Sequence, residues 1–259
     1  MTEFQAFILG IIQGLTEFLP ISSTGHLLLG RKFFGLNEAG LFLDTMLHLG
    51  TLLAVVVIYR SELFYLIKNP TSKLMKLLVI GSIPAVIAAL LFEDLLESLS
   101  NSGVTVGWEF IITGFILFFS DTIKQGAKKV EEITYKDAAF IGSFQAFAIL
   151  PAISRSGLTI AAGIFSGLDR STAAYFSFLL SIPVIAGGVL FQLKDVVSGQ
   201  VEAIPLISLF TAIVTSAIFG YIAIIGMFNY LKKHSLKLFA CYVWILGFVI
   251  IILQLSGSF

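Results

Sequence analysis

Charged side chains are scarce in this chain. Only 12% of its 259 residues are Asp, Glu, Lys or Arg, whereas 57% are hydrophobic and 25 are Phe. A soluble domain of this length would carry about twice that charge. The mean hydropathy is +0.98. The apolar runs are long and do not alternate with polar residues, as the strands of a membrane barrel would. The composition therefore predicts an all-α polytopic membrane protein.

Other absences exclude further classes of protein. The formal net charge is +0, so bulk charge predicts no nucleic-acid partner. The single cysteine, Cys241, cannot form an internal disulfide. The sequence has no P-loop, no Cys or His cluster with zinc spacing and no dinucleotide fingerprint, so phosphate chemistry powered by a bound nucleotide is not expected. Residues 1–3 lack the basic start of a cleavable signal peptide, and we expect the first apolar segment to stay in the mature protein.

Six apolar runs are expected to be full membrane spans. They are Leu41–Tyr59, Lys73–Phe92, Thr105–Ser120, Ser171–Leu193, Ala203–Leu231 and Leu238–Leu255. A broken stretch precedes each set of three spans: two short apolar runs interrupted at Pro20, and Ala138–Leu168 interrupted at Pro151. Broken helices at membrane depth predict re-entrant hairpins, which must be surrounded by protein or a wet cavity.

The two halves of the chain are related by an internal repeat. Adding 132 to a first-half position pairs Gly10 with Gly142, Gln13 with Gln145, Gly25 with Gly157, and Gly35 with Gly167. The segment Ile21–Gly25, Ile-Ser-Ser-Thr-Gly, falls on Ile153–Gly157, Ile-Ser-Arg-Ser-Gly. Shared hydrophobicity alone does not explain matched glycines and hydroxyls.

Three spans, an odd number, separate the two hairpins, so the halves must have opposite orientations. The sequence thus predicts one membrane domain over residues 1–259 with an inverted-topology repeat, each half being a re-entrant helical hairpin plus three transmembrane helices. Repeat 1 covers about residues 1–121, repeat 2 about 137–259, and a cytoplasmic linker about 122–136. Such folds bind their ligand near the membrane midplane, where discontinuous helices of both halves meet.

Basic residues predict the orientation. Three connections that alternation assigns to one side, taken as the cytoplasm, hold 11 of the 16 Lys and Arg residues. These are Arg60, Lys68, Lys73, Lys76, Lys124, Lys128, Lys129, Lys136, Lys232, Lys233 and Lys237. The connection Glu93–Glu109 holds four acids and no base. Both termini and the first hairpin are then expected to face outside, and the second hairpin to enter from the cytoplasm.

The first hairpin gathers polar groups in apolar surroundings, where they are costly. Gln13 and Glu17 are four residues apart, on one face of a helix. The run Ser22–Thr24 precedes a helical segment, which is N-cap chemistry with free N–H groups and a positive dipole end. Such a helix end binds anions. His26 lies three residues after Ser23, so one helical turn would bring its imidazole near that hydroxyl.

The second hairpin repeats this arrangement, with Arg155 where the first has Ser23. An arginine among apolar residues costs at least ~2.5 kcal/mol at a membrane-helix centre, and its planar fork suits phosphate oxygens. Ser154, Ser156 and Thr159 add hydroxyl groups. Two helix N-termini, a guanidinium, hydroxyls, a carboxylate and an imidazole together predict a phosphate-handling site inside a membrane.

These features also have structural interpretations. Ser22 could be only a helix cap, and glycines such as Gly14 and Gly25 could serve close helix packing. Glu17 and Arg155 could form a structural ion pair.

Polar residues near the hairpin have structural interpretations too. Asp44 and His48, four residues apart on a span, are expected to form a satisfied buried pair rather than to act in catalysis. Arg31 and Lys32 could be interface anchors, or could attract an anionic headgroup.

At these residues the chain resembles the bacitracin-resistance type of undecaprenyl-diphosphatase. That family carries an (E/Q)xxxE segment leading into PxSSTGH, here Gln13–Glu17 and Pro20–His26, and a PGxSRSxxT motif, here Pro151–Thr159. The resemblance extends over essentially the whole chain, including Leu47–Thr51. Two positions depart from the pattern: Gln13 stands where many members have a carboxylate, and Ala152 replaces the usual glycine.

The resemblance implies hydrolysis of undecaprenyl diphosphate to undecaprenyl phosphate and inorganic phosphate. This reaction recycles the lipid carrier for cell-wall synthesis and confers bacitracin resistance. The resemblance also implies a divalent cation, Mg²⁺ or Ca²⁺. Glu17, with Gln13 assisting, is expected to bind it, although the amide of Gln13 is a weaker ligand than a carboxylate. The expected partners are the prenyl diphosphate and membrane lipids, and a homodimer is left open. The expected location is a bacterial-type plasma (inner) membrane, with the site opening toward the periplasmic face.

On this hypothesis the catalytic residues are Ser23, His26, Glu17 and Arg155. Ser23 is favoured as the nucleophile, with His26 or Glu17 accepting its proton, while His26 and water stay open as alternative nucleophiles. Arg155 would hold phosphate oxygens as charge develops. The expected substrate-binding residues are Gln13, Ser22, Thr24, Gly25, Ser154, Ser156 and Thr159.

The rival hypothesis is a polyprenyl-phosphate flippase or an anion transporter, because transporters use inverted repeats with broken helices. A transporter would need Arg155 and the helix ends but no nucleophile. The clustering of Ser23, Glu17 and His26 therefore favours the phosphatase.

Overall fold

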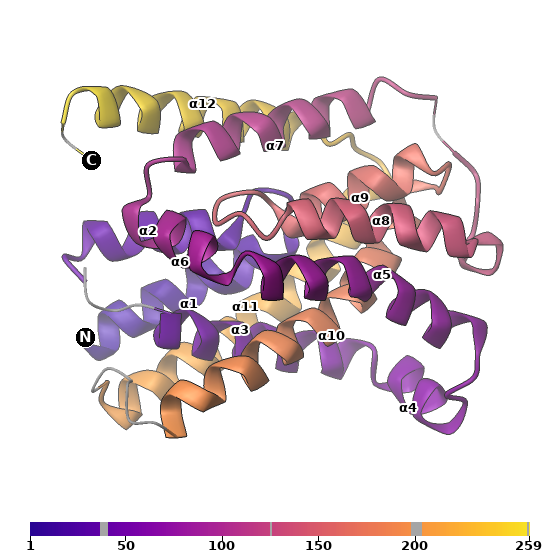
Figure 1. The fold of residues 1–259 in the computed structure, drawn as a ribbon, viewed down its shortest axis with the longest axis horizontal. Coiled ribbons are helices and arrows are strands. Elements are labelled where there is room, and N and C mark those ends of the chain that lie inside the picture. Colours follow the sequence, from indigo (N-terminus) through magenta and orange to yellow (C-terminus); the bar gives the residue numbers. More distant parts are fainter. Residues whose placement is uncertain (37–40, 125, 198–203, 258) are drawn as a thin grey trace.

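The computed structural model describes residues 1–36, 41–124, 126–197, 204–257 and 259, and within these it is built from helices joined by short connections (Figure 1). The α-helices are α1 (Glu3–Phe18), α2 (Ser23–Phe33), α3 (Leu41–Ile58), α4 (Arg60–Lys68), α5 (Lys73–Leu91), α6 (Glu93–Ser102), α7 (Val106–Ser120), α8 (Tyr135–Phe147), α9 (Arg155–Phe165), α10 (Arg170–Val197), α11 (Leu206–Leu231) and α12 (Lys237–Leu255). A short 3₁₀ helix, η1 (Val130–Glu132), precedes α8.

The helices make this a multi-pass membrane protein. Among the described residues, α5, α10, α11 and α12 are long and apolar enough to cross a membrane, and α3 with α4 adds a fifth span bent by 78°. The remaining expected span, Thr105–Ser120, corresponds to α7, which has 15 residues, or about 22 Å, against a hydrocarbon core of about 30 Å. The expected start of the fifth span, Ala203, lies outside the described residues.

The helices of the two hairpins begin with capping residues. Thr2 caps α1 and Thr134 caps α8, each in a capping box. Ser22 caps α2 and Ser154 caps α9, each by accepting a hydrogen bond from the N–H three residues later. The polar turn between the helices therefore also starts the second helix of each hairpin.

Each hairpin packs against a span from the other half of the chain. The helix α1 lies along α11, and α8 lies along α5. Glycines allow this close approach. A Cβ atom on Gly14 would lie 2.7 Å from the backbone nitrogen of Gly220, and one on Gly142 would lie 2.5 Å from the carbonyl oxygen of Gly81. The packing interpretation of Gly14 is thus confirmed.

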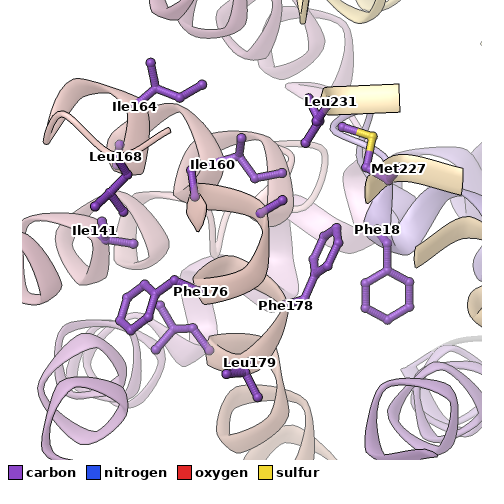
Figure 2. Close-up of a cluster of buried hydrophobic side chains, with 14 of the residues drawn as sticks. Phe18, Ile141, Ile160, Ile164, Leu168, Phe176, Phe178, Leu179, Met227 and Leu231 are labelled. Carbon is purple, nitrogen blue, oxygen red and sulfur yellow. The ribbon is translucent and has the colours of Figure 1, made fainter. Parts of the chain in front are cut away.

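A buried cluster of aliphatic and aromatic side chains fills the space between the two halves (Figure 2). Phe18, at the end of α1, meets Phe178 of α10 edge to face, with 5.4 Å between ring centroids. The same cluster includes apolar side chains of α8, α9 and α11, which are Ile141, Ile160, Ile164, Met227 and Leu231. The core thus fixes the end of α1, where Glu17 lies, against helices of the second half.

Polar contacts tie the connection between the halves to residues 166–169, which join α9 to α10. Lys128 forms backbone hydrogen bonds with this segment, and its carbonyl accepts from the N–H of Asp169 at 3.2 Å. Asp121 pairs with Arg170 at 2.6 Å and accepts from the N–H of Lys237, at the start of α12. Figure 1 shows both termini and α6 at one end of the molecule, and α4 at the other.

Candidate active site

The turns of the two hairpins meet each other. Gly25, at the start of α2, lies against Ala152, and Gly157, at the start of α9, lies against Pro20. A Cβ atom on either glycine would lie 3.1 or 3.3 Å, respectively, from the Cβ of its neighbour. Because the glycines leave this space, the N-terminal ends of α2 and α9 come together.

Glu17, near the end of α1, is buried at this meeting point. Its Oε1 accepts a hydrogen bond from Nη2 of Arg155, the first residue of α9. Its Oε2 accepts from Ser23 Oγ at 2.6 Å and from Gln13 Nε2 at 3.0 Å. The carboxylate thus joins the two hairpins by an ion pair, and it holds the hydroxyl proton of Ser23 as a general base would.

The structure adds His48, on α3, to this cluster. Its Nε2 lies 3.4 Å from Glu17 Oε2, and its Nδ1 lies 2.6 Å from the backbone carbonyl oxygen of Asp44. The predicted side-chain pair between Asp44 and His48 is wrong, because the Asp44 carboxylate pairs with Arg31 at 2.8 Å. Arg31 is buried in this pair, so it is not a simple interface anchor.

The two ring nitrogens of His26 are engaged away from this cluster. Its Nδ1 lies 2.6 Å from the carbonyl oxygen of Ser22, and its Nε2 lies 2.8 Å from the hydroxyl of Tyr242 on α12. Among the described residues no hydrogen bond joins His26 to Ser23 or Glu17. The structure therefore does not bring the imidazole of His26 and the Ser23 hydroxyl together.

Both helix ends offer free backbone donors. Within the described part of the chain, four N–H groups at the starts of α2 and α9 have no acceptor: those of Ser23, Thr24, Arg155 and Ser156. Ser22, before the first of them, has a positive φ of 68°, a conformation that costs about 1–3 kcal/mol outside glycine. Free N–H groups at two helix N-termini form a site for an anion.

The hydroxyls of the second hairpin support the start of α9. Ser154 provides the cap described above, and Ser156 Oγ donates to the Leu19 carbonyl at 2.9 Å. Thr159 Oγ1 lies 2.6 Å from Ser177 Oγ on α10. These contacts fix the first turn of α9, and with it the position from which Arg155 extends.

Two polar residues of α7 hold the second turn, and the sequence did not single them out. The carboxylate of Glu109 accepts from the N–H of Ala152 and from the Thr105 hydroxyl, the latter at 2.5 Å. Thr113 Oγ1 accepts from the N–H of Ser154 at 3.2 Å. Glu109 is buried, although the sequence placed it among the acids of an outer connection. Its spacing of four residues from Thr113, on one face of an apolar helix, was the signal available.

Two buried polar atoms of this site lack a hydrogen-bond partner among the described residues, Arg155 Nη1 and Gln13 Oε1. The first is a charged donor available to a ligand oxygen. Glu17 and Gln13 do not fit as a divalent-cation pair, because both oxygens of Glu17 hold donors and Gln13 directs its nitrogen toward them. No group of three His, Cys, Asp or Glu side chains in the described residues could hold a metal ion.

Comparison with known families agrees with the motifs that form this site. The chain matches the family described as "Bacitracin resistance protein BacA" over residues 6–249. It belongs to this family. The BacA match covers nearly the whole chain, including both hairpins, so the resemblance noted from the sequence is confirmed.

Relatives in the BacA family match the chain over its full length. Undecaprenyl-diphosphatase 4 of Bacillus thuringiensis is 61% identical over 259 residues, which is 100% of both chains. An undecaprenyl-diphosphatase of Carboxydothermus hydrogenoformans is 46% identical over 261 residues, again 100% of both. That of Halothermothrix orenii is 43% identical over 257 residues, covering 98% of each.

Proposed function

We propose that this chain hydrolyses undecaprenyl diphosphate to undecaprenyl phosphate and inorganic phosphate, and so recycles the lipid carrier for cell-wall synthesis and confers bacitracin resistance. The observation that carries the proposal is the hydroxyl of Ser23 bonded to the buried carboxylate of Glu17, which also pairs with Arg155. A nucleophile on a base, beside a guanidinium and free N–H groups, is what attack on phosphorus requires. The names of the relatives support the lipid substrate.

In the proposed reaction Ser23 Oγ attacks the terminal phosphorus while its proton passes to Glu17. The bond between that phosphorus and the bridging oxygen breaks, undecaprenyl phosphate leaves, and the phosphoryl group stays on Ser23. Arg155 Nη1 and the free N–H groups of the two helix ends bind the phosphoryl oxygens as negative charge develops. Glu17 then releases that proton and is a carboxylate again. Water attacks the phosphorus and gives a proton to Glu17, and inorganic phosphate leaves as this proton passes to the Ser23 oxygen.

His26 and a divalent cation, both expected from the sequence, have smaller roles in the proposed reaction. His26 as the direct nucleophile would first have to release its hydrogen bond with Tyr242. No step of the proposed reaction passes through a divalent cation, because the oxygens of the Glu17 carboxylate already accept hydrogen bonds from Gln13, Ser23 and Arg155.

We also propose the inverted-topology repeat, which paired contacts support. Gly25 meets Ala152 as Gly157 meets Pro20, and adding 132 to 20 and to 25 gives the partner positions 152 and 157. The same offset relates the helix caps and the positive-φ glycines that follow α2 and α9: Thr2 and Thr134, Ser22 and Ser154, Gly35 and Gly167. Packing of each hairpin on the other half agrees with this symmetry.

For the orientation, we propose that the connections rich in Lys and Arg face the cytoplasm and that the site opens toward the outer, periplasmic side of the plasma membrane. To test it, Cys241, which is exposed, is replaced by serine, and a cysteine is introduced at the exposed Ser102, the last residue of α6. An impermeant thiol reagent should label Ser102→Cys on intact cells or spheroplasts. Labelling only after permeabilisation would reverse the orientation.

Phosphate release tests the function. The purified full chain in detergent should release phosphate from undecaprenyl diphosphate, and Ser23→Ala should lose at least ~100-fold in kcat. Ser143→Ala, at an exposed serine of α8, is the matched control. Near-normal turnover of Ser23→Ala would move the nucleophile to His26 or water. Lipid transfer across liposomes without phosphate release would favour the transporter.

A further inference from the structure

Two histidines beside the site are anchored in the same way. In both His26 and His48 the ring Nδ1 lies 2.6 Å from the backbone carbonyl oxygen four residues earlier. A carbonyl oxygen only accepts hydrogen bonds, so in each ring Nδ1 carries the hydrogen. In the neutral form of each ring, Nε2 is then an acceptor with a free lone pair.

The partners of the two Nε2 atoms differ. His26 Nε2 faces the hydroxyl of Tyr242, which donates to it, so the neutral ring is satisfied. His48 Nε2 faces Oε2 of Glu17 at 3.4 Å, and a carboxylate oxygen is itself an acceptor. Two hydrogen-bond acceptors can bind each other only when a proton lies between them. The pair formed by His48 and Glu17 is therefore built to share one proton.

The exposed fractions of the side chains indicate the direction in which this proton can be transferred. The side chain of Glu17 is 5% exposed and that of Arg155 is 14% exposed, whereas that of His48 is 24% exposed. Ser23, which also donates to Glu17 Oε2, is buried. Within this cluster, His48 is thus the most exposed member and the one nearest the surface by which a proton taken from Ser23 can leave the site.

The charges around His48 are few. On its own helix Asp44 is paired with Arg31 of α2. Glu17 of α1 faces the ring of His48 and is paired with Arg155 of α9. The helix α11, packed along α3, contains no charged residue. On α10 the first-turn Arg170 is paired with Asp121, and on α4 the charged residues lie beyond the far end of α3.

We propose that His48 is a positioning residue that accepts, through Glu17, the proton released by Ser23, and passes it to solvent; this rests on the proposed phosphatase function. When the Ser23 Oγ–phosphorus bond forms and the bond to the bridging oxygen breaks, the Ser23 proton moves to Glu17 Oε2 and then to His48 Nε2. Glu17 is thereby restored as a carboxylate, ready to take a proton from the water that cleaves the phosphoserine.

The test is the pH profile of kcat/KM for phosphate release by the full chain in detergent. Wild-type activity should rise with pH, because His48 Nε2 can take the proton only when it does not already carry one. His48→Gln keeps a hydrogen-bond donor for Glu17 but cannot take up the proton, so this variant should lose about 10- to 100-fold near pH 7 and should show a shallower pH slope than wild type. The ionisation of the substrate is common to all variants. His234→Gln, in the α11–α12 connection, is the control and should keep the wild-type profile.

The outcomes separate this inference from the function on which it rests. A wild-type protein that releases no phosphate would overturn both. A wild-type protein that is active, with His48→Gln showing the wild-type slope, would overturn the role of His48 and leave the phosphatase standing. If His48→Ala fails to fold, thermal unfolding of His48→Gln shows whether the glutamine variant is intact before its profile is compared.

Discussion

Replacing Arg155 by lysine separates charge from hydrogen-bonding geometry in this site. The guanidinium uses Nη2 to bind Glu17, while Nη1 is buried without a partner among the described residues. The planar fork can therefore hold Glu17 and a phosphate oxygen at once. A lysine ammonium is a compact charge on a flexible stem, so we expect it to remain with Glu17 and to leave the phosphate without its charged donor.

The expected size of the effect follows from that contact. A hydrogen bond to a charged group contributes about 1.5–3 kcal/mol, which corresponds to roughly 10- to 150-fold in kcat/KM at 1.4 kcal/mol per tenfold change. We expect Arg155→Lys to fall in this range. Arg155→Ala should lose at least ~100-fold, as when one oxyanion donor is removed, because it also leaves the buried Glu17 carboxylate without its arginine.

The assay is phosphate release from undecaprenyl diphosphate in detergent, with kcat and KM determined separately. Arg170→Lys is the matched control. This arginine also pairs with a buried carboxylate, that of Asp121, but it lies at the start of α10, away from the site. The control should stay close to wild type. Arg155→Lys activity within about threefold of wild type would refute the two-sided role of the guanidinium.

Three further predictions concern the supports of the site. Glu109→Gln should lower kcat/KM about tenfold and destabilise the fold. A glutamine amide has only one oxygen, so either the N–H of Ala152 or the Thr105 hydroxyl loses its buried acceptor. Thr105→Val removes only the hydroxyl and keeps the contact with Ala152, so it should cost less in the same phosphate assay and thermal melt. Gly142→Ala should lower the melting temperature, since its Cβ would lie 2.5 Å from a carbonyl oxygen of α5 and overpacking costs about 1–3 kcal/mol. Gly187→Ala, with open space around it, should not; equal melting temperatures would contradict the close packing. Gln13→Glu removes the amide donor to Glu17 Oε2 and places a second carboxylate beside it, so kcat/KM should fall at least about tenfold; wild-type phosphate release by this variant would count against this.

The sequence predicted much of the fold because its signals are local. Apolar runs, the breaks at Pro20 and Pro151, and the capping hydroxyls lie within single segments, and the helices begin and end close to the expected residues. It did not predict the short helices α4 and α6. Those depend on where each helix meets the membrane edge and on its neighbours, which residue type alone does not determine.

The site was predicted only where the motifs are contiguous or paired by the repeat. The meeting of Glu17, Ser23 and Arg155 follows from placing two similar turns together. His48 and Glu109 were misjudged, because their roles depend on which face of α3 and α7 packs against the hairpins. The i, i+4 spacing of Asp44 and His48 suggested a pair on one helix, whereas the Asp44 carboxylate pairs with Arg31 of α2.

The packing of α1 against α11 has a consequence for biosynthesis. The ribosome makes the first hairpin early, yet its packing partner is among the last helices to emerge. At about 5–20 residues per second, the hairpin waits roughly 10–40 s before α11 is complete. Until then Glu17 and Gln13 have no second half to bury them, so the nascent chain needs lipid, a chaperone or the insertion machinery to shield them. Catalytic competence would thus appear only after nearly the whole chain has been translated.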